Sequence, residues 1–227
     1  MISVIIPTLN AEKTLARCLE RLIAGVVVGT VREVIIADGG STDETAAIAE
    51  ATGANFIEAP QGRGSQLAAG AEIARGEWLL FLHADTVLEQ GWEAEAASFI
   101  ERAMPGRERA ASFRFALDDF EPAARRLERL VALRCWLFAL PYGDQGLLIS
   151  KRHYRKIGGF RPMALMEDVD IMRRIGRSRL VMLRARAITS AERFRREGYL
   201  RRSVRNLSIL LLYALRVPPR LLARLYG

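Results

Sequence analysis

The first 85 residues alternate between short apolar runs and stretches with the spacing of a helix, and this alternation constrains the fold more than any other feature of the sequence. Strands are predicted at residues 2–7, 33–38, 55–59 and 78–82. Between the first two strands, apolar side chains from Leu15 to Ile23 recur on one face of a helix. Short buried strands separated by helices are typical of a parallel sheet with helices on both faces.

Polar residues follow three of these predicted strands. Thr8 to Asn10 follow the first strand, Asp38 follows the second, and His83-Ala84-Asp85 follow the fourth. In open α/β sheets, ligands bind beyond the carboxyl ends of the strands. We therefore expect a binding site at this edge of the sheet.

The remainder of the chain is less regular. A capping box from Ser41 to Glu44 predicts a helix that begins at Ser41. No linker, repeat or low-complexity tract interrupts the sequence, so we expect one domain over residues 1–190 with a helical C-terminal extension over 191–227. Further helices are predicted at 65–75, 92–103, 122–140, 166–175 and 198–217, and further strands at 112–117, 146–150 and 180–184.

The net charge of +8 is divided unequally along the 227 residues. Residues 1–120 hold 10 basic and 18 acidic residues, whereas residues 121–227 hold 24 and 8, which gives net charges of −8 and +16. This asymmetry indicates an anionic partner for the second half, either a lipid surface, a phosphorylated substrate or nucleic acid. Solvated helices of an arginine-rich protein would explain the same counts.

Composition excludes several classes of protein. Two cysteines and two histidines do not suffice for a disulfide framework or a histidine-rich zinc cluster, and reduced thiols are expected. No signal peptide precedes the first strand, and the apolar runs are shorter than the roughly 20 residues that span a bilayer. We expect a cytoplasmic protein. The Gly-rich fingerprint of a Rossmann dehydrogenase does not follow the first strand, and a P-loop is absent.

Four further motifs occur in a fixed order, and each is placed at or near the end of a predicted strand. They are Pro7 to Glu12 (PTLNAE), Asp38 to Asp43 (DGGSTD), Gly62 to Gly76 with Trp78 to Asp85 (WLLFLHAD), and Glu167-Asp168. Their order and spacing resemble family 2 glycosyltransferases over roughly residues 1–175. The resemblance implies an α/β chain with the GT-A fold, a Rossmann-like, mixed and mostly parallel sheet of the kind found in nucleotide-diphospho-sugar transferases.

The second half narrows the resemblance. Gly143 to Gly146 (GDQG), Thr189 to Ala191 (TSA) with Phe194 and Gly198, and the hydrophobic ending up to Tyr226 resemble a small bacterial subgroup of the family. That subgroup is labelled arsenosugar-biosynthesis-type and is often found beside radical-SAM genes. The Gln-x-x-Arg-Trp motif of processive members does not occur here, which favours a single transfer over polymerisation.

The resemblance implies a binding site for a nucleotide-sugar donor, UDP-linked by preference. In the family, Asp38 and the Thr8 region hold the uracil and ribose, and Arg63 lies near the base and phosphates. Taken alone, Asp38 would be read as a turn residue, because Asp-Gly is a common turn dipeptide, but its place beside Thr8 and Asp85 favours a binding site. The expected donor-binding residues are Pro7, Thr8, Leu9, Glu12, Asp38, Arg63, Gln66, His83, Ala84 and Asp85.

Asp85 is the candidate metal ligand. Phosphate-rich sites use Mg²⁺ or Mn²⁺ held by few carboxylates, with substrate phosphates completing the coordination. The family pattern here is Asp-x-Asp, and this chain departs from it because His83 takes the first position. The structural alternative is that His83 is a buried core histidine and that Asp85 caps a following helix.

Asp168 matches the catalytic base of the resembled family, and Glu167 is the other member of the catalytic pair. The resemblance implies inversion: Asp168 removes the proton of an acceptor hydroxyl as that hydroxyl attacks the anomeric carbon. Acids at a helix N-terminus also complement the helix dipole without any catalytic role. Gly143, Asp144 and Gln145 are expected on the acceptor side of the cleft, or in a plain turn.

Two segments near the C-terminus suggest further contacts. Arg193, Arg195 and Arg196 lie where related proteins place a phosphate-facing loop, although the acidic Glu192 precedes them. Three arginines precede the apolar run from Leu207 to Leu215, which fits a helix on the inner face of an anionic membrane. A helix buried against the sheet or in a homodimer fits as well.

We expect the acceptor to be a small hydroxylated molecule or a lipid carrier.

Two rival functions are weaker. A sugar-phosphate nucleotidyltransferase uses a related sheet, but it typically needs a Gly-rich N-terminal loop with a lysine, and the loop here holds Lys13 without glycines. A basic nucleic-acid-binding module would cluster its cations among aromatic residues. The arginines here are spread over helices and the first half is acidic, so no nucleic-acid partner is expected.

Overall fold

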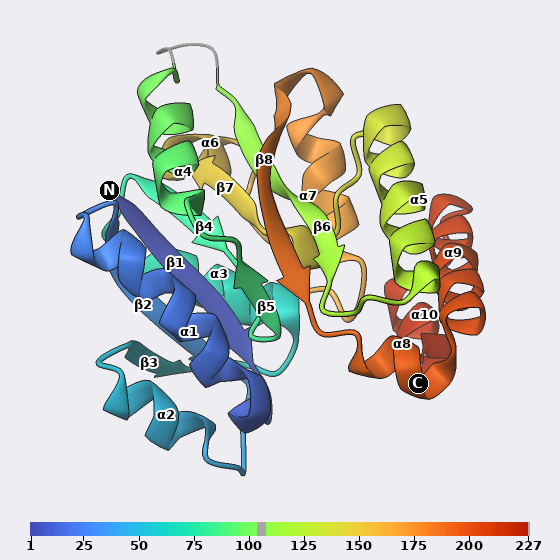
Figure 1. The fold of residues 1–227 in the computed structure, drawn as a ribbon, viewed down its shortest axis with the longest axis horizontal. Helices are drawn as coiled ribbons and strands as arrows, with labels where there is room; N and C mark the ends of the chain where they lie inside the picture. Colours follow the sequence, from blue (N-terminus) through green and yellow to red (C-terminus); the bar gives the residue numbers. More distant parts are fainter. Residues whose placement is uncertain (104–107, 227) are drawn as a thin grey trace.

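A computed structural model describes residues 1–103 and 108–226. Within them, eight strands form one sheet in the order β3-β2-β1-β4-β7-β6-β8-β5 (Figure 1). The strands are β1 (Ile2–Thr8), β2 (Val31–Asp38), β3 (Asn55–Glu58), β4 (Trp78–Phe81), β5 (Thr86–Leu88), β6 (Ala110–Leu117), β7 (Leu147–Ser150) and β8 (Leu180–Thr189). The helices are α1 (Glu12–Val27), α2 (Thr45–Ala51), α3 (Arg63–Ile73), α4 (Trp92–Glu101), α5 (Pro122–Phe138), α6 (Lys151–Lys156), α7 (Glu167–Ile175), α8 (Glu192–Glu197), α9 (Tyr199–Ala214) and α10 (Pro219–Tyr226), with short 3₁₀ turns η1 (Gly143–Gln145) and η2 (Arg177–Arg179).

The sheet is mixed and mostly parallel, as predicted. Strands β3, β2, β1 and β4 run parallel, and β6 runs parallel to β8. Strands β7 and β5 pair antiparallel with their neighbours. The carboxyl ends of β1 and β2 therefore lie at the same edge of the sheet, next to the end of β4.

Two apolar clusters fill the two faces of this sheet. Every residue of β1 is buried, and successive side chains point to opposite faces. Val4 and Ile6 pack with residues of α1 and α4, whereas Ile5 packs with residues of α3 and α7. The near-continuous apolar runs of the first half follow from this burial on both faces.

The predicted capping box at Ser41 is wrong. Helix α2 begins at Thr45, and no side chain caps it. The hydroxyl of Ser41 instead donates to Oδ1 of Asp38 at 2.5 Å, and the backbone N–H of Glu44 donates to the carboxylate of Glu12 at 3.3 Å. Residues 41–44 therefore form a loop that joins the ends of β1 and β2.

Strand β8 is longer than the predicted 180–184 and reaches Thr189. Its buried residues Leu183, Ala185 and Ala187 alternate with the exposed Arg184 and Arg186. This alternation is typical of a strand with one face in the core. The prediction missed the second half of this strand because a segment rich in arginine resembles a loop in the sequence.

The predicted helix at 198–217 is present as α9, and a further helix, α10, follows it. Helix α9 ends at Ala214, Arg216 adopts a left-handed φ of 66°, and α10 begins at Pro219. The proline pair at 218–219 prevents the first helix from continuing. Helix α9 lies beside α5 (Figure 1) and contacts α10, and Ile209 of α9 packs with Leu165 and Leu222.

No helix in the described part of the chain is long and apolar enough to cross a membrane. Both cysteines are unbridged and both are buried. Burial raises the pKa of each thiol.

Asp119 ties the C-terminal helices to the sheet. Its Oδ2 accepts hydrogen bonds from the hydroxyl of Tyr199 at 2.5 Å and from Nε of Arg195 at 2.9 Å. These hydrogen bonds hold the pKa of Asp119 well below its ordinary value. A carboxyl whose pKa is lower in the folded chain stabilises the fold above its unfolded pKa of about 3.9, and this stabilisation is lost as the pH falls towards the folded value.

We predict that Asp119→Asn lowers the melting temperature at neutral pH. We also expect the melting temperature of this variant to fall less between neutral and acidic pH than that of the unmodified chain. Denaturation at about pH 7 and about pH 3 measures both effects. The neighbouring Asp118→Asn is the control, because its ion pair with Arg17 joins two exposed side chains. Equal melting temperatures for Asp119→Asn and the unmodified chain would contradict this role.

Candidate active site

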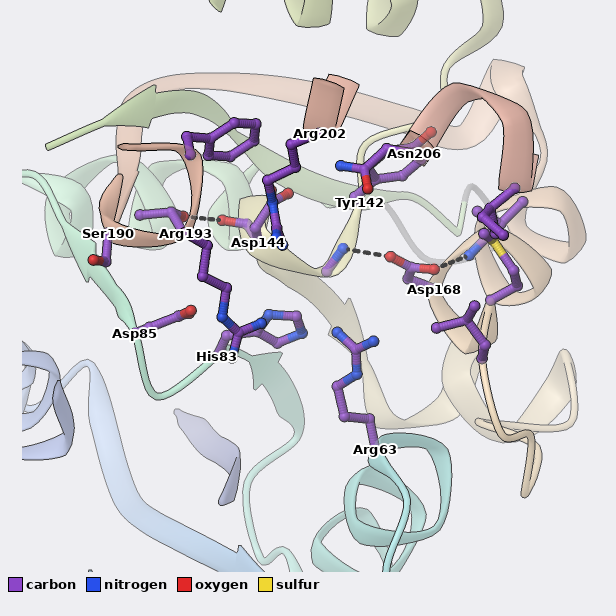
Figure 2. Close-up of a pocket in the computed structure, with 17 residues that line it drawn as sticks. Arg63, His83, Asp85, Tyr142, Asp144, Asp168, Ser190, Arg193, Arg202 and Asn206 are labelled. Carbon is purple, nitrogen blue, oxygen red and sulfur yellow. Dashed lines mark hydrogen bonds between the residues drawn. The ribbon is translucent and has the colours of Figure 1, made fainter. Parts of the chain in front are cut away.

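A cavity of about 150 Å³ lies between the end of β4, the start of α7 and helix α9. Figure 2 shows Arg63, His83 and Asp85 on one side of it and Asp144, Arg202 and Asn206 on the other. Its lining also includes Tyr142, Gly143, Leu165, Met166, Asp168, Val169, Thr189, Ser190, Arg193, Phe194 and Ile209. Residues from six separate segments of the chain therefore meet in one space.

The carboxylate of Asp168 is held at the start of α7. Its Oδ2 accepts a hydrogen bond from the backbone N–H of Gly143 at 2.9 Å, and its Oδ1 accepts one from the N–H of Val169 at 2.7 Å. Met166, two residues earlier, adopts a left-handed φ of 70°. This conformation is costly for a residue other than glycine, and such strain concentrates at functional sites.

Glu167 points away from the large cavity. It is buried, and its Oε1 lies 3.1 Å from Nε of the more exposed Arg63. Burial raises the pKa of Glu167, and the positive charge of Arg63 opposes that rise. Of the two acids predicted to be catalytic, Asp168 lines the cavity and Glu167 positions Arg63.

His83 packs against Gly143. Loss of hydration, followed by the nearby charge of Arg63, lowers the pKa of His83 to about 4, so its ring is neutral at pH 7. A Cβ atom on Gly143 would lie 2.5 Å from Nε2 of His83, so only glycine permits this approach. The alternative that Asp85 caps a helix is wrong, since strand β5 follows it.

The three predicted acceptor-side residues have different surroundings. Gly143 and Asp144 line the cavity, and Oδ1 of Asp144 is buried without a hydrogen-bond partner among the described residues. Burial raises the pKa of Asp144 to about 7. Gln145 is buried elsewhere, where its Nε2 donates to the carbonyl of Phe113 at 3.0 Å. The segment is a 3₁₀ turn.

The expected nucleoside-binding residues form a second group at the ends of β1 and β2. The carboxylate of Asp38 accepts hydrogen bonds from Thr8 Oγ1 at 2.7 Å, from the N–H of Gly40 at 2.9 Å, and from both the N–H and hydroxyl of Ser41. Although burial raises the pKa of Asp38, these hydrogen bonds lower it overall. Asp38 thus organises its own loop.

Gln66 joins the same two strand ends. Its Nε2 donates to the carbonyl of Thr8 at 2.7 Å and to the carbonyl of Ala37 at 2.8 Å. Leu9 is exposed, and the carboxylate of Glu12 accepts from the loop that follows β2. Pro7 and Ala84 are buried. These residues lie outside the lining of the large cavity, so the structure divides the predicted donor site into two groups.

Asp85 is the residue that the sequence analysis predicts to bind Mg²⁺ or Mn²⁺. Among the described residues, no three His, Cys, Asp or Glu side chains gather into a set that could hold a metal ion. Asp85 lines the cavity beside the neutral ring of His83. This arrangement fits a cation that takes one carboxylate from the protein and most of its remaining oxygen ligands from phosphates and water.

The sequence did not identify the residues that α9 contributes. Arg202, Asn206 and Ile209 line the cavity, although the segment reads as an apolar extension. They occupy one face of the helix, at spacings of four and three residues, which is the signal that could have found them. Of the three arginines expected to face phosphates, Arg193 lines the cavity, whereas Arg195 is paired with Asp119.

Comparison with known proteins gives a match to a family model and several similar relatives. Residues 3–110 match the model of the glycosyl transferase family 2. A PGL/p-HBAD biosynthesis glycosyltransferase of Mycobacterium tuberculosis is 41% identical over 113 residues, which are 46% of this chain and 43% of that protein. A glucosyl-3-phosphoglycerate synthase of Mycolicibacterium paratuberculosis is 33% identical over 95 residues, 38% of this chain and 29% of that protein. The chain thus spans less than half the length of these relatives.

Two solved structures show the same fold. Residues 1–349 of Staphylococcus aureus TarS superpose with a TM-score of 0.64 at 18% identity, covering 84% of this chain and 60% of that one. Glucosyl-3-phosphoglycerate synthase from Mycobacterium tuberculosis, in complex with Mn²⁺, UDP and glucosyl-3-phosphoglycerate, gives 0.60 at 20% identity, covering 84% and 70%. The chain therefore has the GT-A fold, and its residues 3–110 are similar to glycosyl transferase family 2.

Proposed function

We propose that this chain is a metal-dependent, inverting and non-processive glycosyltransferase that moves a sugar from a UDP-linked donor to a hydroxyl group of an acceptor. The observation that carries the proposal is the convergence of Asp85, Asp168 and Arg63 on one cavity at the carboxyl edge of a GT-A sheet. Residues 3–110 match the glycosyl transferase family 2 model, and a relative named as a glycosyltransferase is 41% identical over 113 residues. Sugar-phosphate nucleotidyl transfer has no comparable support.

Asp168 is the proposed general base. Two backbone N–H groups hold its carboxylate at the cavity wall, so the side chain is fixed before an acceptor arrives. A carboxylate in hydrogen-bond reach of an acceptor hydroxyl can take the proton as that oxygen attacks the sugar. Attack from the side opposite the departing nucleotide inverts the anomeric centre without a covalent intermediate.

Asp85 is the proposed ligand of Mn²⁺ or Mg²⁺. A divalent cation bound here would neutralise charge on the departing diphosphate. Structures of the similar glucosyl-3-phosphoglycerate synthase carry Mn²⁺ or Mg²⁺ together with UDP. His83 stays neutral at physiological pH and therefore adds no positive charge of its own.

The nucleoside lies, in this proposal, along the loops that follow β1 and β2. Thr8 and Asp38 shape these loops through their mutual hydrogen bond, and exposed Leu9 is available to a base. Arg63 is paired with Glu167 and lines the same cavity as Asp168. We also propose that the chain belongs to the arsenosugar-biosynthesis-type subgroup, whose name does not identify the acceptor.

A peripheral contact with the inner face of an anionic membrane is a further part of the proposal. Trp136 and Phe138 of α5 are 71% and 63% exposed, and Leu200 and Leu207 of α9 are 79% and 56% exposed. The sequence after Glu197 contains six arginines and no acidic residue. Apolar side chains among cations are typical of helices that lie on anionic lipid. A homodimer would cover the same residues.

We predict that UDP with Mn²⁺ raises the melting temperature more than GDP or dTDP does, and that Asp85→Ala removes the part of the shift that depends on Mn²⁺. A ligand at 100 times its Kd stabilises the folded state by about 2.7 kcal/mol. Glu20→Ala, on the exposed face of α1, is the control. A full Mn²⁺-dependent shift in Asp85→Ala would exclude Asp85 as the ligand.

We predict that Asp168→Asn binds the UDP-sugar normally and loses transfer by about 10²- to 10⁴-fold, because the amide cannot accept the proton. Release of UDP from the donor, in the presence of an acceptor extract, measures the rate. Asp170→Asn is the matched control on the same helix, since Asp170 is paired with Arg174 and Arg161. Loss of UDP-sugar binding in Asp168→Asn would mean a structural role.

We predict that the chain sediments with phosphatidylglycerol vesicles and not with phosphatidylcholine vesicles, and that Trp136→Ser with Phe138→Ser reduces this binding several-fold. Salt should weaken it as well, because screening reduces the attraction between arginines and anionic lipid. Val27→Ser, at an exposed apolar position on α1, is the control. Absence of vesicle binding together with a dimeric mass in solution would assign these helices to a homodimer.

A further inference from the structure

A second cavity, of about 110 Å³, lies between α5 and α9 and adjoins the first. Four residues line both cavities: Tyr142, Asp144, Phe194 and Asn206. The rest of the second lining is mostly apolar and consists of Phe115, Leu127, Val131, Arg134, Ser203 and Leu207. The two spaces therefore adjoin at these four side chains, and the second is an apolar groove beside the cavity that Asp168 lines.

The junction of the two cavities holds two buried oxygens without partners. Oδ1 of Asp144 and Oδ1 of Asn206 have no hydrogen-bond partner among the described residues. Buried polar atoms are nearly always paired, and each exception calls for a missing partner. Both atoms accept hydrogen bonds when Asp144 is ionised, so hydroxyl groups of a ligand are the donors that would satisfy them.

The wall beside this junction is rigid. The guanidinium of Arg134 lies 3.5 Å from the centre of the Tyr142 ring. Arg134 also donates to the carbonyl of Leu140 and to Oε1 of Gln145. These contacts hold Tyr142 in place without a ligand, so the groove is present before anything binds. Figure 2 shows Tyr142 and Asn206 across the cavity from Arg63.

We propose that the groove between α5 and α9 is an acceptor subsite that takes an alkyl or aromatic group, while the hydroxylated part of the same acceptor lies at Asp144, Asn206 and Asp168. The inference rests on the proposed transferase function and adds the chemical class of its acceptor: an amphiphile with a polyhydroxyl head. A purely polar acceptor would leave the apolar groove filled with water, which is unfavourable.

The experiment compares binding of octyl β-glucoside with binding of methyl β-glucoside, in the presence of UDP, by calorimetry below the micelle concentration. We expect one site and at least about tenfold tighter binding of the octyl compound, because each buried methylene contributes several-fold in affinity. Butyl and hexyl glucosides should give intermediate values in the unmodified chain. Equal affinities along this series would overturn the inference without any variant.

Two neighbouring positions on α9 supply matched variants. Ser203 lines the groove, whereas Val204 is 54% exposed and lines neither cavity. Ser203→Trp should fill the groove and reduce the preference for the octyl compound to about one, and Val204→Trp should retain it. A folded Ser203→Trp that keeps the full preference would overturn the inference.

Different results would contradict the proposed function and this inference. The donor site is tested by the rise in melting temperature that UDP causes in the unmodified chain and in the two variants. We expect the same rise in all three, because Ser203→Trp and Val204→Trp lie outside the donor site. A chain that binds octyl glucoside tightly but does not bind UDP would contradict the transferase function and leave the groove as an apolar ligand site. Normal UDP binding without a preference for alkyl chains would contradict the inference and leave the transferase function intact.

Discussion

The close approach of Gly143 to two other segments is the constraint on which the candidate site depends. The N–H of Gly143 donates to Asp168, and its Cα lies so near to His83 that a Cβ would collide with the ring. The end of β4, the turn η1 and the start of α7 are brought together at this one residue. The positions of Asp85 and Asp168 relative to each other follow from this packing, since each belongs to one of the joined segments.

Charge is distributed around the cavity in a way that suits a diphosphate and a cation together. Three carboxylates and three guanidinium groups of the described residues line it. The acids are Asp85, Asp144 and Asp168, and the bases are Arg63, Arg193 and Arg202. Loss of hydration keeps His83 neutral and raises the pKa of Asp144 to about 7, so the site avoids an accumulation of either charge.

The C-terminal helices complete the cavity and do more than cover the fold. Helix α9 supplies Arg202, Asn206 and Ile209 to the lining, and Asp119 anchors the start of this helix through Tyr199. An expected boundary at residue 190 therefore divides the sequence at a point that the site itself crosses. The same helix exposes apolar side chains on its outer surface.

The sequence by itself determined the sheet of the first half and the positions of its polar strand ends. Apolar runs such as Ile2–Pro7 are buried on both faces, which is a local pattern, and the carboxyl ends of parallel strands meet at one edge for any sequence that forms them. Three of the residues that the sequence singled out, Asp85, Asp168 and Gly143, line one cavity in the structure.

Only the tertiary structure decided which polar side chains are available to a ligand. Asp38 and Gln66 form their hydrogen bonds within the protein, and Glu167 pairs with Arg63. Ser41 donates to Asp38 within a loop, where the local pattern predicted a helix cap. The groove between α5 and α9 was equally invisible, because residues more than sixty positions apart in the chain form it. Hydrogen-bond partners and cavity walls are set by long-range packing, and no local spacing encodes them.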